Sequence, residues 1–134
     1  MVFKKKLKKE GKKEQLVEYG SLIFGIGILI ALIAGFIPNL SITATNVLIG
    51  TLGILGIIIG FLNITKEEET KFLVAIISLV ILLQIFFTAT LPALNFPKSS
   101  ILIVGKIFTN IITLLVPAAI VVSLKVLFLT AKDE

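Results

Sequence analysis

The sequence predicts an all-α membrane protein, a bundle of four transmembrane helices in up-down-up-down order behind a basic N-terminal tail. Three observations support this fold class. Hydrophobic residues make up 57% of the 134-residue chain, charged residues only 16%, and the mean hydropathy is +1.11. Soluble domains carry roughly 25% charged residues, so the charge here cannot cover a water-soluble globule. Four uncharged stretches of 18 to 20 residues separate short polar segments, and such stretches span about 27–30 Å as helices, the thickness of a bilayer core.

Residues 1–18 are distinct from the rest of the chain because they contain seven lysines and three glutamates, a net charge of +4. We expect a cytoplasmic tail, in which Phe3 and Leu7 can anchor a short helix at the membrane surface. Lysines near a membrane attract anionic lipid headgroups. The lysines expected to do so are Lys4, Lys5, Lys6, Lys8, Lys9, Lys12 and Lys13.

Residues 19–134 are expected to form the transmembrane domain, with helices at about 19–37, 47–64, 72–91 and 101–129. The first ends at Pro38 and the third before Pro92. The apolar runs are continuous, unlike the alternating strands of a β-barrel, and backbone groups in lipid need partners within their own segment, which leaves α-helices. Short connections make successive helices antiparallel. The first apolar stretch is longer than the 7–15 residues of a signal peptide, although the spacing of Ala31 and Ala34 leaves cleavage open.

The lysines outside the apolar cores predict the orientation in the cell membrane. Positive charge in short loops marks the cytoplasmic side. The tail, the loop between the second and third helices and the C-terminal end all carry lysines, whereas the first loop has none and the third has Lys98, with Lys106 nearby. Both termini are therefore expected in the cytoplasm. Of the two Asn-x-Ser/Thr sequences, only the one at Asn39 would then face outside. Asn39 is either a glycosylation site or an ordinary residue of the loop that ends the first helix.

Several residue types are missing, and their absence limits the chemistry. The chain has no cysteine and no histidine, which removes thiol catalysis and the usual ligands of zinc, haem and iron–sulfur clusters. Every carboxylate lies outside the apolar cores, whereas proton and sodium relays usually need buried acidic groups. No aromatic residues alternate with the tail lysines, as single-strand nucleic-acid binding requires. We therefore expect that the protein is not an enzyme and that it binds no cofactor, no metal and no nucleic acid.

Small residues line one face of each of the first two helices. The first face covers about 60° of arc and the second about 120°. In lipid, small residues let helix backbones approach closely, so these faces pack either inside one bundle or against another copy of the chain. They comprise Gly20, Gly27, Ala31 and Ala34 on the first helix and Gly50, Gly53, Gly56 and Gly60 on the second.

Polar residues gather on the third and fourth helices. Lys106, Asn110, Thr113 and Pro117 lie within about 60° of arc on the fourth helix, where Pro117 should produce a kink. Gln84 and Thr88 share a face of the third helix, in the same half of the membrane. These side chains can hold the helices together by hydrogen bonds, or line a ligand pocket or permeation path, while Lys106 can instead extend to the outer surface.

Two stretches carry a family resemblance, GFLNITKEEETKFLVA (residues 60–75) and VPAAIVVSLK (residues 116–125). They resemble segments of small, uncharacterised four-span membrane proteins of archaea. The resemblance covers under a quarter of the chain and contains no catalytic motif. It implies a similar fold and an archaeal membrane, and it implies no activity and no site residues.

Taken together, these features predict a non-enzymatic structural or assembly protein of the membrane. It would pack through its glycine-rich faces into a homo-oligomer or with another membrane protein, with the lipid bilayer as its surroundings. One alternative is a passive channel for small solutes, lined by Gln84, Lys106, Asn110 and Thr113, in which a ring of lysines would favour anions. Another is an accessory subunit whose basic tail docks a cytoplasmic partner.

Overall fold

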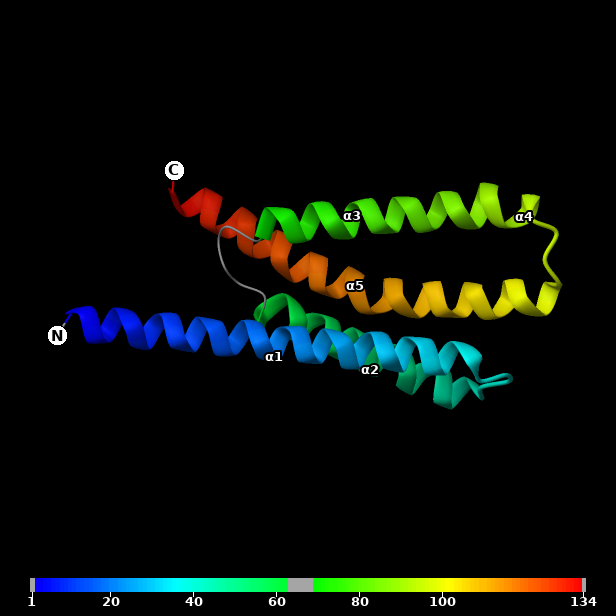
Figure 1. The fold of residues 1–134 in the computed structure, drawn as a ribbon, viewed down its shortest axis with the longest axis horizontal. Coiled ribbons are helices and arrows are strands. Elements are labelled where there is room, and N and C mark those ends of the chain that lie inside the picture. The colour runs from blue at the N-terminus through cyan, green and yellow to red at the C-terminus, as the bar shows by residue number, and fades with distance from the viewer. Residues whose placement is uncertain (1, 63–68, 134) are drawn as a thin grey trace.

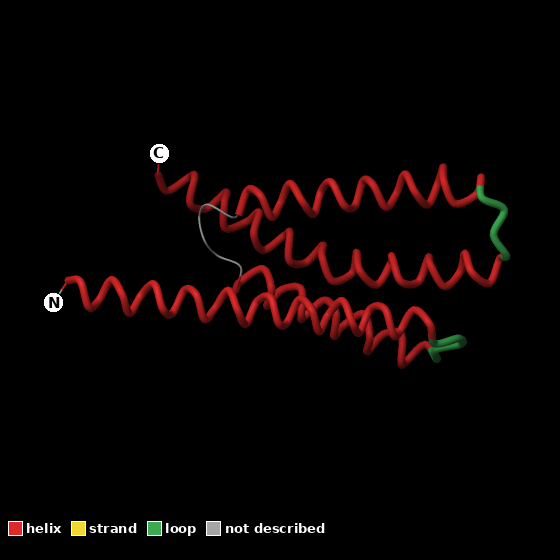
Figure 2. Tube along the Cα trace, viewed as in Figure 1, coloured by secondary structure: helices red, strands yellow, loops and turns green. Residues whose placement is uncertain are grey.

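The computed structural model describes residues 2–62 and 69–133, except for the side chains of residues 13, 16, 17 and 133. Within this part the chain is helical, with short connections (Figures 1 and 2). Stretches of 19, 21, 25 and 35 residues are long and apolar enough to cross a membrane, which confirms the predicted four-span helical bundle. The helices are α1 (Val2–Phe36), α2 (Ile42–Leu62), α3 (Glu69–Ile85), a π-helical turn η1 (Phe86–Thr90), α4 (Leu91–Ala93) and α5 (Lys98–Asp133). Residues 63–68 lie outside the described part, and with them the expected end of the second helix, the first residues of the expected loop and the second Asn-x-Ser/Thr sequence. The side chain of Lys13 lies outside it as well.

The lysine-rich segment is part of the first helix, which begins at Val2 and not near residue 19. Lysine, glutamate and glutamine are good helix formers, and nothing in residues 2–18 stops a helix that the following apolar segment already stabilises. Figure 1 shows the blue end of α1 projecting beyond the end of α2 and the start of α3. The described lysine side chains in this projection, Lys4 to Lys12, are exposed.

Helix α2 also begins earlier than expected, at Ile42. Ser41 explains the difference, because its Oγ accepts a hydrogen bond of 3.1 Å from the backbone N–H of Ala44. This is the usual N-cap contact, which satisfies an N–H group that has no partner within the helix. Before it, Asn39 has a positive φ of 57°, a conformation that asparagine tolerates better than most residues. The 37–41 connection is therefore a tight turn.

The sequence predicts that the third span ends before Pro92, and this prediction is wrong. The span continues through η1 into α4, which contains Pro92 and ends at Ala93. In η1 the N–H of Leu91 donates to the carbonyl of Phe86, five residues earlier. A proline lacks the N–H group and its ring crowds the carbonyl four residues before it. The wider π-turn just before Pro92 lets the helix continue past this residue.

Helix α5 is the centre of the bundle, because α1, α2 and α3 all pack on it. Both termini lie at one end, which we call the terminal end, and the 37–41 and 94–97 connections lie at the other, the hairpin end (Figures 1 and 2). A core cluster of fully buried residues joins Leu52 and Ile59 of α2 to Leu114 and Ala118 of α5. Figure 1 shows α5 bending near its middle, as expected from Pro117, which lies inside this helix.

Helix α3 is the least buried of the spans, since Glu69 and Ile76 are its only buried residues. Its packing partner is mainly α5. At the hairpin end, the ring of Phe108 on α5 meets Phe86 and Phe87 edge-on, with ring centroids 5.8 and 5.9 Å apart. Such aromatic pairs contribute about 0.5–1.5 kcal/mol each beyond their buried area. They join the far end of the third span to α5.

Candidate functional site

The small-residue face of α1 is turned into the bundle. Gly20, Gly27, Ala31 and Ala34 are all buried. A Cβ added at Gly27 would lie 2.8 Å from Leu114 Cδ2, so this glycine makes room for a core side chain of α5. On this helix the predicted close packing occurs within one chain.

The small-residue face of α2 is divided between two environments. Gly56 and Gly60 are buried against α5, where added Cβ atoms would collide with the carbonyl oxygens of Leu114 and Ala118. Both glycines and both carbonyls are four residues apart, so one helical turn of α2 matches one turn of α5. Only glycine permits this approach of two backbones.

Gly50 and Gly53 are different, because a Cβ at either position would find nothing within 4 Å. Both lie toward the hairpin end of α2, and Gly50 is exposed. Asn46 and Ile57 share this face, within about 60° of arc, and both are exposed. We call Asn46, Gly50, Gly53 and Ile57 the open face of α2. Gly53 is half-buried, whereas the other three residues are exposed.

The five predicted polar residues surround one cavity of about 680 Å³ between α2, α3, η1 and α5. We call it the polar cavity. Two lining threonines were not singled out from the sequence: Thr109 precedes Asn110 by one residue, and Thr45 belongs to α2. Its walls are mostly apolar. The polar residues that line it are Gln84, Thr88, Lys106, Asn110 and Thr113, together with Thr45 and Thr109.

The sequence suggests that the polar side chains could join α3 to α5 by hydrogen bonds. The hydrogen bonds around the polar cavity do not connect these two helices. Thr88 Oγ1 donates to the Gln84 carbonyl at 2.9 Å, and Thr113 Oγ1 donates to the Thr109 carbonyl at 2.8 Å. Each hydroxyl thus bonds within its own helix, because the carbonyl four residues earlier is the nearest acceptor. Asn110 Nδ2 instead donates across the bundle to the Ala31 carbonyl of α1, at 3.3 Å.

A charged contact at the terminal end was not predicted from the sequence. Lys125 Nζ donates to the carbonyls of Gly60 and Phe61 at 3.3 and 3.1 Å, and it lies 5.0 Å from the centroid of the Phe61 ring. These carbonyls belong to the last turn of α2, where intrahelical donors are lacking and positive charge is favourable. The sequence signal for this contact is the position of Lys125 directly after the uncharged stretch of residues 107–124.

Glu69 is the other unexpected feature at this end. It is only 5% exposed, and its Oε1 has no hydrogen-bond partner within the described part of the chain. The sequence alone predicts Glu69 in the loop of residues 65–71, before the third span. It is instead the first residue of α3, where a carboxylate is favoured by the helix dipole.

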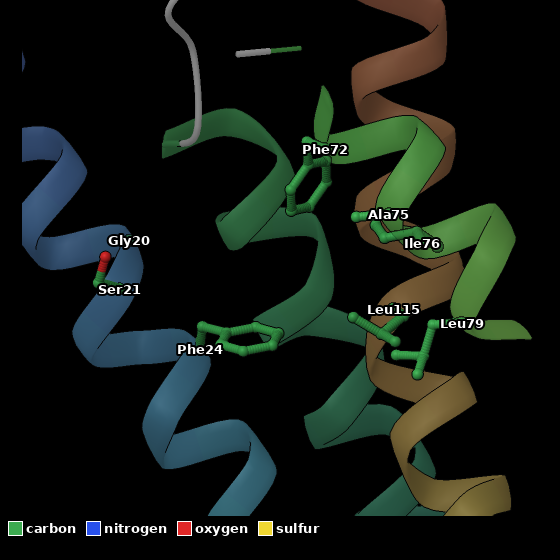
Figure 3. Close-up of a pocket in the computed structure, with 8 residues that line it drawn as sticks. All are labelled: Gly20, Ser21, Phe24, Phe72, Ala75, Ile76, Leu79 and Leu115. Carbon is green, nitrogen blue, oxygen red and sulfur yellow. The ribbon is translucent and has the colours of Figure 1, made fainter. Parts of the chain in front are cut away.

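A second cavity of about 320 Å³ lies between α1 and α3, nearer the terminal end. Figure 3 shows Phe24 of α1 and Phe72 and Leu79 of α3 around it, with Leu115 of α5 behind them. Its lining is almost wholly apolar, and Ser21 contributes the only hydroxyl. Because the lining lacks groups for specific polar contacts, this cavity fits a hydrocarbon chain and nothing more selective.

Comparison with known proteins adds no relative: no family model, no curated protein and no solved structure matches this chain.

Proposed function

We propose that this chain is a non-enzymatic assembly protein of the membrane, and that the open face of α2 packs against the same face of a second copy. The observation that supports this proposal is the environment of Gly50 and Gly53. Six of the eight residues in the predicted small-residue faces are buried within the bundle, whereas these two have nothing within 4 Å of an added Cβ.

The physics of helix association in lipid favours this face over the others. Lipid chains are as apolar as leucine, so helices associate through close backbone contact and interhelical hydrogen bonds. Gly50 and Gly53 allow the close contact. Asn46, one turn before Gly50, supplies an exposed amide that can donate and accept across a two-fold interface. The exposed lipid-facing side chains elsewhere on the bundle are mostly large and apolar.

The distribution of lysines supports an orientation with both termini in the cytoplasm of the cell. The exposed lysines of α1 lie at the terminal end, as do Lys71 and Lys132, whereas Lys98 and Lys106 are at the hairpin end. The excess of positive charge marks the cytoplasmic side. The projecting turns of α1 would then lie beside the anionic inner surface of the membrane, where each lysine contributes about 1 kcal/mol of attraction.

The test is the oligomeric state in lipid nanodiscs or mild detergent, by native mass spectrometry and cross-linking. Gly53→Leu should convert the oligomer to monomer, because the larger side chain separates the two backbones. Gly25→Leu on α1 is the matched control, since Gly25 also has nothing within 4 Å of an added Cβ. It should leave the oligomer intact. A wild-type chain that stays monomeric, or equal dissociation by both variants, would contradict the proposal.

A passive channel is the second candidate, favoured by the gathering of the predicted polar residues around one cavity. On α5 the polar lining ends at Thr113, and the next residues toward the terminal end include Leu114, Leu115 and Val122, all buried. A path across the membrane would therefore have to run between copies of the chain. Liposomes should then leak small anions, and Lys106→Leu should abolish the flux. Vesicles that stay tight would rule out the channel.

A further inference from the structure

The polar cavity combines one cation with a largely apolar lining. Lys106 is the charged residue among those that line it, and Phe87, Phe108, Leu83 and Ile112 supply apolar walls. Its volume of about 680 Å³ falls within the roughly 300–1,000 Å³ of small-ligand sites. Leu102 and Ile49, which also line it, are 66% and 48% exposed. The cavity is therefore accessible from the membrane around the protein.

Its polar donors are not all occupied within the chain. The hydroxyls of Thr88 and Thr113 donate to backbone carbonyls. Among the described residues, in contrast, no hydrogen bond or ion pair engages the Lys106 ammonium or the Gln84 amide. Both side chains are exposed. An ammonium and an amide N–H₂ are donors, so together they favour an anion that brings oxygen acceptors.

The depth of Lys106 indicates what kind of anion reaches it. The uncharged core of α5 runs over residues 107–124, 18 residues that span about 27 Å, close to the thickness of the hydrocarbon layer. Lys106 thus lies at the boundary where lipid headgroups begin. From there the cavity lining continues to Thr113, about 10 Å deeper into the hydrocarbon. The charged end of the polar cavity therefore lies at the depth of the lipid headgroups, and its apolar part lies at the depth of the lipid hydrocarbon chains.

We propose that the polar cavity binds one membrane lipid with an anionic phosphate headgroup. The phosphate pairs with Lys106 and accepts from the Gln84 amide, while one hydrocarbon chain lies against Phe108 and Ile112. The proposal is independent of self-assembly through α2, because the open face and the cavity lining share no residue. A soluble phosphate could use the same donors, but it would leave the apolar walls without a partner.

The experiment uses the full chain in nanodiscs of equal parts phosphatidylcholine and phosphatidylglycerol, each lipid in turn carrying a photoreactive group in one acyl chain. Cross-linked peptides are identified by mass spectrometry. The phosphatidylglycerol label should attach preferentially to residues 101–113. Lys106→Gln should lower this preference over phosphatidylcholine about fivefold, the contribution of one lysine to lipid attraction. Lys98→Gln is the control, because Lys98 is exposed on the same helix and does not line the cavity.

A second pair of variants tests the chain-binding part. Thr109→Phe should fill the cavity and reduce labelling of residues 101–113 by either lipid, whereas Leu127→Phe, at a 66%-exposed position outside the cavity, should not. Equal labelling by the two lipids in the wild type, or equal effects of Lys106→Gln and Lys98→Gln, would overturn the proposal. So would displacement of the label by millimolar glycerol phosphate, which would make the ligand a soluble anion.

Discussion

Replacing Gly56 by alanine probes the closest approach in the bundle. An added Cβ would collide with the carbonyl oxygen of Leu114 and would lie 3.3 Å from Pro117 Cβ. A backbone carbonyl and a proline ring cannot rotate away as a flexible side chain can. The helices α2 and α5 must therefore separate, and the separation would loosen the buried contact between Leu52, Ile59 and their α5 neighbours.

The magnitude follows from two opposing effects. Overpacking a tight contact costs about 1–3 kcal/mol of the free energy of unfolding, whereas alanine is intrinsically better than glycine in a helix by roughly 0.8–1.0 kcal/mol. Gly25→Ala isolates the second effect, because Gly25 lies outside the open face of α2 and a Cβ there meets nothing within 4 Å. We expect the free energy of unfolding of Gly56→Ala to be about 2 kcal/mol lower than that of Gly25→Ala, which is about 30-fold in the unfolding equilibrium.

The assay is unfolding by sodium dodecyl sulfate in mixed micelles, followed by circular dichroism and by limited proteolysis. Gly27→Ala provides an intermediate case. Its added Cβ would meet the tip of the Leu114 side chain at 2.8 Å, which can move, so the loss should fall between those of the other two variants. If Gly56→Ala is as stable as Gly25→Ala, the close contact between α2 and α5 is wrong.

Two further predictions concern polar contacts between helices, both measured by the same unfolding assay. Asn110→Leu removes the hydrogen bond to the Ala31 carbonyl and should cost about 0.6 kcal/mol, a typical value for an interhelical hydrogen bond in lipid; an unchanged stability would show that this bond contributes nothing. Lys125→Met removes the cation from the last turn of α2 and from the ring of Phe61 and should cost about 1 kcal/mol. Lys132→Met, near the exposed end of α5, is its control, and equal losses in the two variants would contradict the capping role.

Composition and charge were sufficient to predict the four spans and their class. Long uncharged stretches leave few options in a chain with 57% hydrophobic residues, because backbone groups in lipid must find partners within their own helix. The grouping of Lys106, Asn110 and Thr113 on one face followed from helical periodicity alone. The helix ends were less predictable, since Ser41 and the π-turn before Pro92 act through local backbone geometry.

Only the tertiary structure decided which faces point inward. In a soluble helix the apolar side marks the core, but a membrane helix is apolar on all sides, so its sequence does not distinguish protein neighbours from lipid. Glycines indicate that a close approach occurs, but they do not identify the partner. The structure separates Gly56, which contacts α5, from Gly50, where an added Cβ has no described residue within 4 Å. The partner of Asn110 and the burial of Glu69 likewise depend on how α1, α3 and α5 lie together in space.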